Sequence, residues 1–479
     1  MENIKKKIFT SVIWRFCEQF STQIVSFLVS IVLARLLGPE EFGTIALLTI
    51  FIALSECIVN SGFGRALIQK KNADELDFNS VFYFSIIISC IAYLLLFFLS
   101  PYIASFYSKP ILIPILRVTA LKLFFDAISS VQNAVLSKEM LFSKSFLITL
   151  PSTIISGISG IYLAYIDFGI WALVWSSLIG SIIATILRWF LIGWKPKLIF
   201  SYKRLKELFS YGSKLLASGL LNTFFTQIYG LLIGKFYSSR DLGFYNRGSH
   251  IPRFSMSSIQ GSISSVLLPA LSKEQENIET IKNITRKSIQ TSSLLIFPLM
   301  FFLATISKPL ILILYTEKWA FAIPFMQMAC ITYAFWHLHT TNLQVILALK
   351  RSDIYLILEA TKKVLILISL AITLPFGVIW LALGEVILTP FNCIINSYPN
   401  IKLINYKPKE QISDCGPSII CSIISSISSL CASFFITNIF LTIAIQGVVF
   451  FTIFCSLAYI CDVPLFKTFL DKFKEKILG

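Results

Sequence analysis

Ionisable side chains recur inside long apolar stretches of this sequence, where a charge at the bilayer centre costs roughly 2.5–3.5 kcal/mol on insertion scales. Charges kept at that depth usually face a partner or a water-filled cavity. Arginine and lysine there can hold an anion, and arginine suits phosphate in particular. Carboxylates can bind a cation or act as counter-ions. The candidate anion-binding bases are Arg15, Lys122, Lys214, Arg247 and Arg253, and the candidate cation-binding carboxylates are Glu18, Glu56, Asp126 and Glu385.

Some of these charges have a purely structural explanation. Lys122 and Asp126 are four residues apart, and Arg15 and Glu18 are three apart, so each pair shares one helix face and can neutralise itself. The stretch 242–268 is harder to explain in this way, because serines, arginines and a proline interrupt it throughout. A helix this polar at membrane depth is expected to line a water-filled space.

The composition predicts a membrane protein. The chain has 479 residues, of which 56% are hydrophobic and only 14% charged, and its mean hydropathy is +0.78. A soluble fold of this length cannot bury so much apolar surface. The net charge of +16 could indicate nucleic-acid binding. The basic residues are instead distributed along the chain as expected for loops at the inner face of a membrane, and we expect no nucleic-acid partner. The ten cysteines show no metal or disulfide spacing, and we expect no cofactor or metal site.

The apolar stretches predict an all-α, polytopic membrane protein with about 14 transmembrane helices, because each helix satisfies its own backbone within lipid. The expected spans are residues 12–36, 42–62, 78–100, 111–136, 145–166, 169–192, 208–236, 242–268, 288–307, 322–348, 354–375, 377–398, 417–437 and 440–460.

The loops between these spans predict the orientation. With the N-terminus inside, nearly all loop lysines and arginines lie on the inner side, and the outer loops hold only Lys109, Arg240, Lys308 and Lys318. Basic loops stay in the cytoplasm, so both termini are expected there. With a wrong number of spans, the loops after the error would be assigned to the opposite side of the membrane. The excess of lysine and arginine in the inner loops continues along the whole chain, and it therefore supports the span count as well.

The sequence also contains an internal repeat. Residues 31–35 and Glu41-Phe42-Gly43 are echoed by residues 231–235 and Asp241-Leu242-Gly243, with base, acid and glycine at identical spacing. Six spans separate the copies, so both have the same orientation, which predicts two parallel six-helix halves of a transporter type. The expected division is an N-terminal lobe (1–193), a cytoplasmic linker (194–207), a C-terminal lobe (208–400) and two additional spans (401–479).

Two amphipathic helices are expected on the inner membrane surface. One covers about 465–477, where apolar residues recur at helical spacing between lysines, and the other covers 272–287. Enzyme signatures such as a phosphate-binding loop or a zinc motif are absent from the sequence. A membrane-embedded polysaccharide polymerase or glycosyltransferase stays an alternative of another class, although its catalytic residues would need larger outer loops than those expected here.

Several short motifs resemble the Wzx-type flippases of the polysaccharide transport family, within the multidrug/oligosaccharidyl-lipid/polysaccharide (MOP) exporter superfamily. The similarity is greatest to the branch that includes the colanic acid exporter. The motifs appear in family order across roughly residues 1–400. They are Ala34–Gly43, Gly62-Phe63-Gly64, Val135–Phe142, Asp241–Arg247 and Leu268–Ser272.

The resemblance implies two lobes around a central cavity and alternating access driven by an ion gradient rather than ATP. It implies an undecaprenyl-pyrophosphate-linked oligosaccharide as substrate, flipped from the inner to the outer leaflet of the cell inner membrane. A proton or sodium ion, membrane lipid, a polysaccharide polymerase and a chain-length regulator would be the partners. Two alternatives within the superfamily stay open, a lipid II flippase and a multidrug/cation antiporter. An antiporter cavity should be dominated by carboxylates and aromatic side chains, whereas the polar spans here are richer in arginine and lysine.

Overall fold

The computed structural model is predominantly helical, and the part of the chain that it describes contains no strand. It describes residues 2–60, 64, 66–67, 70, 73–463 and 465–467, without the side chains of residues 2–9, 210, 211, 214, 258, 262 and 265. Eleven of the expected spans coincide with described helical segments long and apolar enough to cross a membrane. The expected spans 111–136, 242–268 and 354–375 are helical too, although the first is broken into two helices and the others contain more polar or charged residues than most of the eleven. The predicted all-α membrane fold is therefore confirmed.

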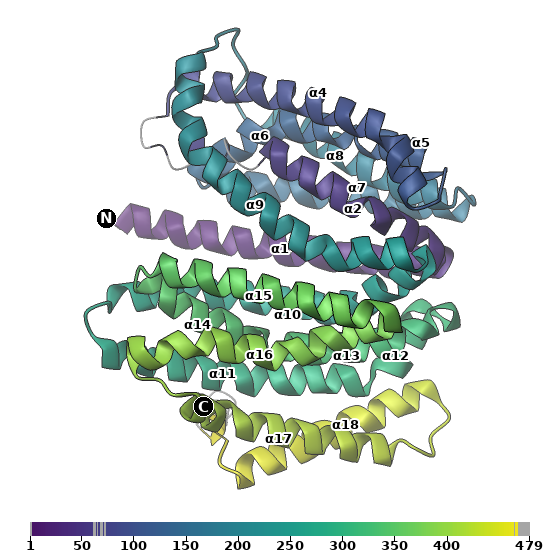
Figure 1. Cartoon of the computed structure of the whole chain (residues 1–479), viewed down its shortest axis with the longest axis vertical. Coiled ribbons are helices and arrows are strands. Elements are labelled where there is room, and N and C mark those ends of the chain that lie inside the picture. Colours follow the sequence, from purple (N-terminus) through teal and green to yellow (C-terminus); the bar gives the residue numbers. More distant parts are fainter. Residues whose placement is uncertain are drawn as a thin grey trace. The chain divides into compact units, whose positions relative to one another are not determined.

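Contacts divide the chain into two compact units, Met1–Gly243 and Phe244–Gly479. In the first unit α7 packs between α1 and α8, α2 packs against α9, and α4 packs against α6 (Figure 1). Buried side chains from five of these helices meet in one core, among them Val81, Val131 and Ile148. The helices of this unit are α1 (Glu2–Leu36), α2 (Pro39–Asn60), α4 (Glu75–Phe106), α5 (Leu112–Thr119), α6 (Lys122–Lys138), α7 (Phe142–Tyr165), α8 (Ile170–Leu191), α9 (Tyr202–Phe236) and the first residues of α10 (Ser239–Lys273).

Local signals explain where these helices begin. The Asp74 carboxylate accepts a hydrogen bond from the backbone N–H of Asp77, and Asp77 accepts one from Asp74 in return, which forms a capping box before α4. The first of these bonds holds the pKa of Asp74 below its usual range. The expected linker 194–207 is irregular only as far as residue 201, because α9 begins at Tyr202. It packs on α4 through Trp194, whose ring centroid lies 5.6 Å from that of Phe82. The lobe boundaries expected from the repeat stay a prediction.

The repeated motif has the same local structure in both copies. The Glu41 carboxylate accepts a hydrogen bond from the backbone N–H of Gly38 at 2.9 Å, immediately before α2. Two hundred residues later, the Asp241 carboxylate accepts one from the backbone N–H of Ser238 at 3.2 Å, immediately before α10. The motif acid is therefore a helix-capping residue, because it satisfies a backbone donor that the first turn leaves open.

The second unit is built around α11, which packs against α13, α14 and α17 (Figure 1). Phe297, Met300 and Val345 are among its fully buried core side chains. The remaining helices after α10 are α11 (Ile278–Thr305), α12 (Ser307–Tyr315), η1 (Glu317–Ala322), α13 (Ile323–Ala334), α14 (Trp336–Ala348), α15 (Ser352–Thr373), η2 (Leu374–Phe376), α16 (Val378–Ile404), α17 (Pro408–Ala432) and α18 (Ile439–Ile460).

A buried carboxylate fastens the additional helix α17 to this unit. Asp414 is 3% exposed and accepts two hydrogen bonds from the Arg286 guanidinium, both at 2.8 Å. Gln290 and Tyr406 donate to the same carboxylate at 2.7 Å each. A buried charge is tolerated when its oxygens are satisfied in this way. The contact therefore makes α17 an integral part of the second unit.

Both halves break the corresponding span. Expected span 111–136 is divided at Ala120 and Leu121 between α5 and α6, and expected span 322–348 is divided at Phe335 between α13 and α14. The turns around these spans also match, because residues with positive φ occur at equivalent junctions in both halves. These residues are Ser108, Met140 and Gly169 in one half and Thr316, Lys350 and Gly377 in the other.

Two sequence-based expectations differ from the structure or lie outside its described part. The expected surface helix 272–287 does not exist as one element, because α10 ends at Lys273 and α11 begins at Ile278. Ile281 is fully buried, so this segment contributes to the core of the second unit rather than to a lipid-facing surface. The expected C-terminal amphipathic helix lies outside the described residues beyond Lys467, as do Gly62 and Phe63 of the glycine-containing motif.

Candidate functional site

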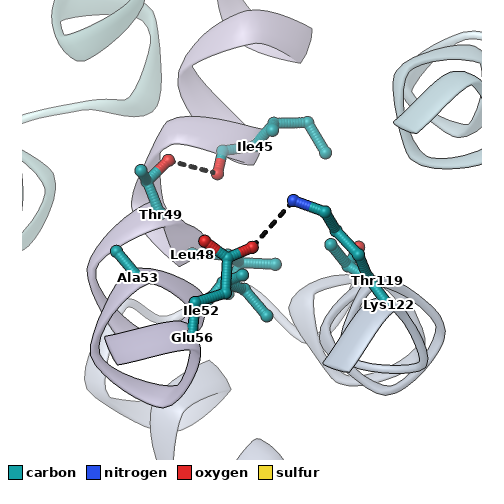
Figure 2. A pocket seen from close by; sticks show the side chains of 8 residues that line it. All are labelled: Ile45, Leu48, Thr49, Ile52, Ala53, Glu56, Thr119 and Lys122. Carbon is teal, nitrogen blue, oxygen red and sulfur yellow. Dashed lines mark hydrogen bonds and ion pairs between the residues drawn. The ribbon is translucent and has the colours of Figure 1, made fainter. Parts of the chain in front are cut away.

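Lys122 and Glu56 face each other across a pocket of about 240 Å³ in the first unit. Glu56 lies on α2, and Lys122 is the first residue of α6, directly after the break that ends α5. The Lys122 ammonium donates a hydrogen bond to Glu56 Oε1 at 2.8 Å (Figure 2). The two side chains are 29% and 30% exposed, so the ion pair remains accessible from the pocket. Thr49 of α2 and Thr119 of α5 also line this pocket (Figure 2).

Asp126 follows one helical turn after Lys122 and therefore lies on the same face of α6. Its charge interacts with Lys122, with Glu56 and with Arg188 of α8. Within the described part of the chain its carboxylate accepts no hydrogen bond, and the Nε atom of Arg188 is buried without a partner. The Lys122 ammonium thus has two carboxylates within reach and is bonded to only one of them.

Glu18 forms a second charged centre between α1 and α7. It is 5% exposed and accepts hydrogen bonds from Arg15 at 2.9 Å, Ser145 at 2.7 Å and Thr149 at 3.3 Å. Arg15 is about half exposed and also lies over the ring of Phe142. The possibility that Arg15 and Glu18 neutralise each other is therefore confirmed, whereas the hydrogen bond of Lys122 goes to Glu56 rather than to Asp126.

These two centres are connected through Arg188, whose charge interacts with both Asp126 and Glu18. The first unit therefore contains a series of alternating charges across α1, α8, α6 and α2, which we call the charge series. Its members, in order, are Arg15, Glu18, Arg188, Asp126, Lys122 and Glu56. Such an arrangement offsets the cost of six charges at membrane depth, because each has a neighbour of opposite sign.

The bases expected in the second half have different surroundings. Arg247 is only 6% exposed, and its guanidinium lies over Tyr315 at 5.0 Å and Trp319 at 5.3 Å from the ring centroids. These cation–π contacts enclose the side chain between α10, α12 and η1. Arg253, two turns further along α10, is exposed. Lys214 lies within α9, but its side chain is outside the described part of the structure.

Glu385 of α16 accepts a hydrogen bond from the Tyr245 hydroxyl at 3.0 Å. Tyr245 lies on α10, and its ring contacts Phe325 of α13. Glu385 therefore belongs to the second unit, whereas the charge series belongs to the first.

Sequence reasoning missed Arg188, Tyr245 and the Tyr315–Trp319 aromatic pair. Arg188 is a base inside expected span 169–192, and that position could have identified it as a further charge at membrane depth. The tyrosine and the aromatic pair carry no such signal, because aromatic residues are frequent throughout this chain. The repeat places expected spans 42–62 and 242–268 in equivalent positions, but it does not predict which aromatic side chains enclose Arg247.

A family model described as "Polysaccharide biosynthesis protein" matches residues 32–324 of this chain. The chain belongs to this family. Its relatives include the teichuronic acid biosynthesis protein TuaB of Bacillus subtilis, which is 26% identical over 74% of each chain. The lipopolysaccharide biosynthesis protein WzxC of Escherichia coli is 22% identical over 78% of this chain and 76% of that protein. The family resemblance predicted from the motifs is therefore confirmed.

Solved structures confirm the fold of this family member. The lipid II flippase MurJ in an inward closed conformation matches 98% of this chain and 100% of its own, with a TM-score of 0.79 and 17% identity. An inward-facing multidrug resistance MATE transporter of the MOP superfamily matches 80% of this chain and 96% of its own, with a TM-score of 0.62 and 16% identity. The predicted MOP-type helical architecture agrees with both matches.

Proposed function

We propose that this chain flips an undecaprenyl-pyrophosphate-linked oligosaccharide from the inner to the outer leaflet of a bacterial inner membrane. The cargo would be a repeat unit of O-antigen, capsule or exopolysaccharide. One observation carries the proposal: a member of a polysaccharide biosynthesis family has the fold of a lipid flippase along almost its whole length. The names of its relatives, which refer to teichuronic acid, succinoglycan transport and lipopolysaccharide, support an envelope polysaccharide as cargo.

The chain would act as a transporter rather than an enzyme, by alternating access driven by a proton or sodium gradient. A pyrophosphate brings at least two negative charges into a low-dielectric site, where a base contributes far more than it does in water. We assign its binding to Arg15, Lys122, Lys214, Arg247 and Arg253, with Arg15, Lys122 and Arg253 as the members accessible in their own units. Glu18, Glu56, Asp126 and Glu385 would respond to the coupling ion.

The proposed setting is the inner membrane with both termini in the cytoplasm. A polysaccharide polymerase and a chain-length regulator would receive the flipped cargo at the outer face. The concentration of lysine and arginine in alternate expected loops supports this orientation, because basic loops are retained on the cytoplasmic side.

The test is to reconstitute the purified full-length chain into liposomes with undecaprenyl-pyrophosphate-linked oligosaccharide in both leaflets. A membrane-impermeant enzyme that modifies the exposed sugar then reports how much cargo becomes accessible from outside. We expect the wild-type chain to make the inner-leaflet pool accessible and a vesicle without protein to protect it. Protection of that pool in both preparations would contradict flipping.

A second candidate cargo is lipid II, favoured by the match to MurJ over the full length of both chains. The same liposome assay distinguishes the two, because lipid II and an oligosaccharide-linked carrier share the polyprenyl pyrophosphate and differ in the headgroup. Movement of lipid II alone would replace the main proposal with this one.

A further inference from the structure

Lys122 lies between two carboxylates on different helices and is bonded to only one of them. Its ammonium donates to Glu56 Oε1 across the pocket at 2.8 Å, while Asp126 lies one turn away on α6. Side chains four residues apart on a helix are about 5–6 Å apart at their Cβ atoms, so a change of rotamer brings the lysine to Asp126 without backbone movement. The geometry therefore contains two positions for one cation.

The Asp126 carboxylate is available to accept a hydrogen bond from the Lys122 ammonium. Within the described residues its carboxylate accepts no hydrogen bond, although its charge interacts with Lys122, Glu56 and Arg188. Glu56 in turn would lose its cation when the lysine moves, and it borders a pocket of about 240 Å³ that also exposes the Thr49 and Thr119 hydroxyls. A carboxylate left alone at membrane depth becomes neutral by taking up a proton.

We propose that Lys122 exchanges between Glu56 and Asp126 and that Glu56 binds the coupling proton when the lysine leaves it. This inference rests on the proposed transport function and names both its coupling ion and the place where that ion binds. In the step, the hydrogen bond from Lys122 Nζ to Glu56 Oε1 breaks and one to the Asp126 carboxylate forms. A proton from water in the pocket then adds to Glu56, and the reverse movement of the lysine returns that proton to water.

A proton suits this site better than a metal cation. Lys122 and Arg188 already place two positive charges beside the carboxylates, and a bound sodium ion would repel both. Hard metal ions also require several oxygen ligands. The described part of the chain contains no cluster of three or more side chains of the kind that hold a metal ion. A proton needs only one carboxylate oxygen.

The other charged groups around the pair complete the electrostatic setting. The charge of Arg188 on α8 interacts with both Asp126 and Glu18, and Glu18 of α1 is bonded to Arg15. Arg117 of α5 donates instead to Ser100 of α4 and lies over Phe97, so it is held by other partners. The balance of charge at Glu56 is therefore set chiefly by the position of Lys122.

Infrared difference spectroscopy of the full-length protein in detergent, between acidic and neutral pH, tests the exchange without any cargo. Among the carboxyl C=O bands that the wild-type protein gains at acidic pH, one should belong to Glu56. Glu56→Gln should abolish that band, because its carboxyl group is removed and Lys122 then stays on Asp126. Asp126→Asn should abolish the same band, because Lys122 then stays on Glu56. Glu56→Asp should retain it, and Glu359→Gln, which removes the partner of Lys362 in an ion pair of the second unit, should leave it unchanged.

Two results would overturn the exchange. If Glu56→Gln and Asp126→Asn each remove a different part of the band, the two carboxylates titrate independently. If neither variant alters the band while both remain folded by size-exclusion chromatography, the proton binds elsewhere. Because no lipid is present, these outcomes are separate from the liposome assay. If the wild-type chain moves no lipid-linked oligosaccharide in liposomes, the proposed function is contradicted. The infrared experiment still decides whether Glu56 binds the proton.

Discussion

Gly43 of α2 lies directly against the backbone of Ser239 at the start of α10, so closely that a Cβ at position 43 would overlap the Ser239 carbonyl oxygen. The reverse contact exists as well, because a Cβ at Gly243 would overlap the carbonyl oxygen of Pro39. Positions 39 and 43 are the repeat equivalents of 239 and 243. The two copies therefore meet in a reciprocal contact, as expected around a two-fold axis.

This reciprocal contact gives the motif glycines a physical purpose, since only glycine allows two backbones to approach so closely. Lys109 strengthens it by donating to both Glu40 and Ser239, at 2.7 and 2.8 Å. The basic loops assign this end of the helices to the outer face. The contact would then lie at the outer end of α2 and α10.

Substitution of Gly43 or Gly243 by alanine should force the two copies apart. Overpacking of this kind typically costs about 1–3 kcal/mol. We expect a lower melting temperature in detergent and faster labelling of a cysteine at position 239 by a membrane-impermeant thiol reagent, in a background without the native cysteines. Ser239 is 3% exposed in the wild-type structure, so slow labelling is the reference.

Gly261→Ala is the matched control, because a Cβ at that position of α10 meets no atom within 4 Å. It should leave both the melting temperature and the labelling rate close to wild type. If the cysteine at position 239 is labelled at the same rate in the Gly43, Gly243 and Gly261 variants, the reciprocal contact does not shield this position from water.

The sequence predicts the helices, the repeat and most of the charge series, for identifiable physical reasons. Apolar length specifies a span, and Arg15, Glu18, Glu56, Lys122 and Asp126 are conspicuous because charges are rare inside such spans. Which charges pair is not predictable from spacing alone. Lys122 and Asp126 have ideal helical spacing, yet the hydrogen bond goes to Glu56, a residue 66 positions away. That choice depends on how α2 packs against α6.

The break in two spans illustrates the same limit. Nothing in the apolar pattern of 111–136 or 322–348 marks the interruption, because neither contains a proline or glycine at the break. The surface helix expected over 272–287 is wrong for a related reason. Its amphipathic spacing is genuine, but Ile281 packs against the second unit's core instead of lipid.

Removal of the guanidinium at position 286 should weaken the attachment of α17. Arg286→Ala leaves the buried Asp414 carboxylate with Tyr406 and Gln290 but without its cation. Breaking a buried pair costs about 3–5 kcal/mol, and because Arg286 is itself 36% exposed we expect about 2 kcal/mol. Thermal unfolding in detergent measures the loss.

Arg351→Ala is the comparison for this prediction, since Arg351 and Asp353 form an exposed pair that should contribute little. An additional Asp414→Asn change in the Arg286 variant should recover part of the lost stability, because it removes the uncompensated charge. If the two arginine variants unfold at the same temperature, the buried contact does not fasten α17.

Thr316 adopts a backbone conformation that glycine prefers, with φ of 73° and ψ of 174° at the end of α12. Such a conformation costs a residue with a side chain on the order of 1–3 kcal/mol. Thr316→Gly should therefore stabilise the second unit by about 1 kcal/mol, after the greater unfolded-state entropy of glycine is counted. Thermal unfolding should show a higher midpoint for this variant, and a lower one for Thr361→Gly in the interior of α15. A lower midpoint for both would contradict the strain at Thr316.

The distribution of basic residues makes a prediction about sidedness that is independent of any cargo. A reporter enzyme that is active only outside the inner membrane should be inactive when fused after Gly479, because an even number of spans returns the C-terminus to the cytoplasm. The same reporter fused after Ser108, in the turn that follows α4, should be active. A fusion after Lys350, between α14 and α15, should again be inactive.

These three fusions test the span count as well as the orientation. Activity after Ser108 together with inactivity after Lys350 requires an odd number of crossings between them, and the expected spans starting at residues 111, 145, 169, 208, 242, 288 and 322 provide seven. If the broken helix α5–α6 did not cross the membrane, every later segment would change sides and the fusion after Gly479 would be active. Protein amounts are compared by immunoblot, so that low activity is not mistaken for low expression. Strong activity after Gly479 would refute the topology, and with it the parallel relation of the two repeat copies.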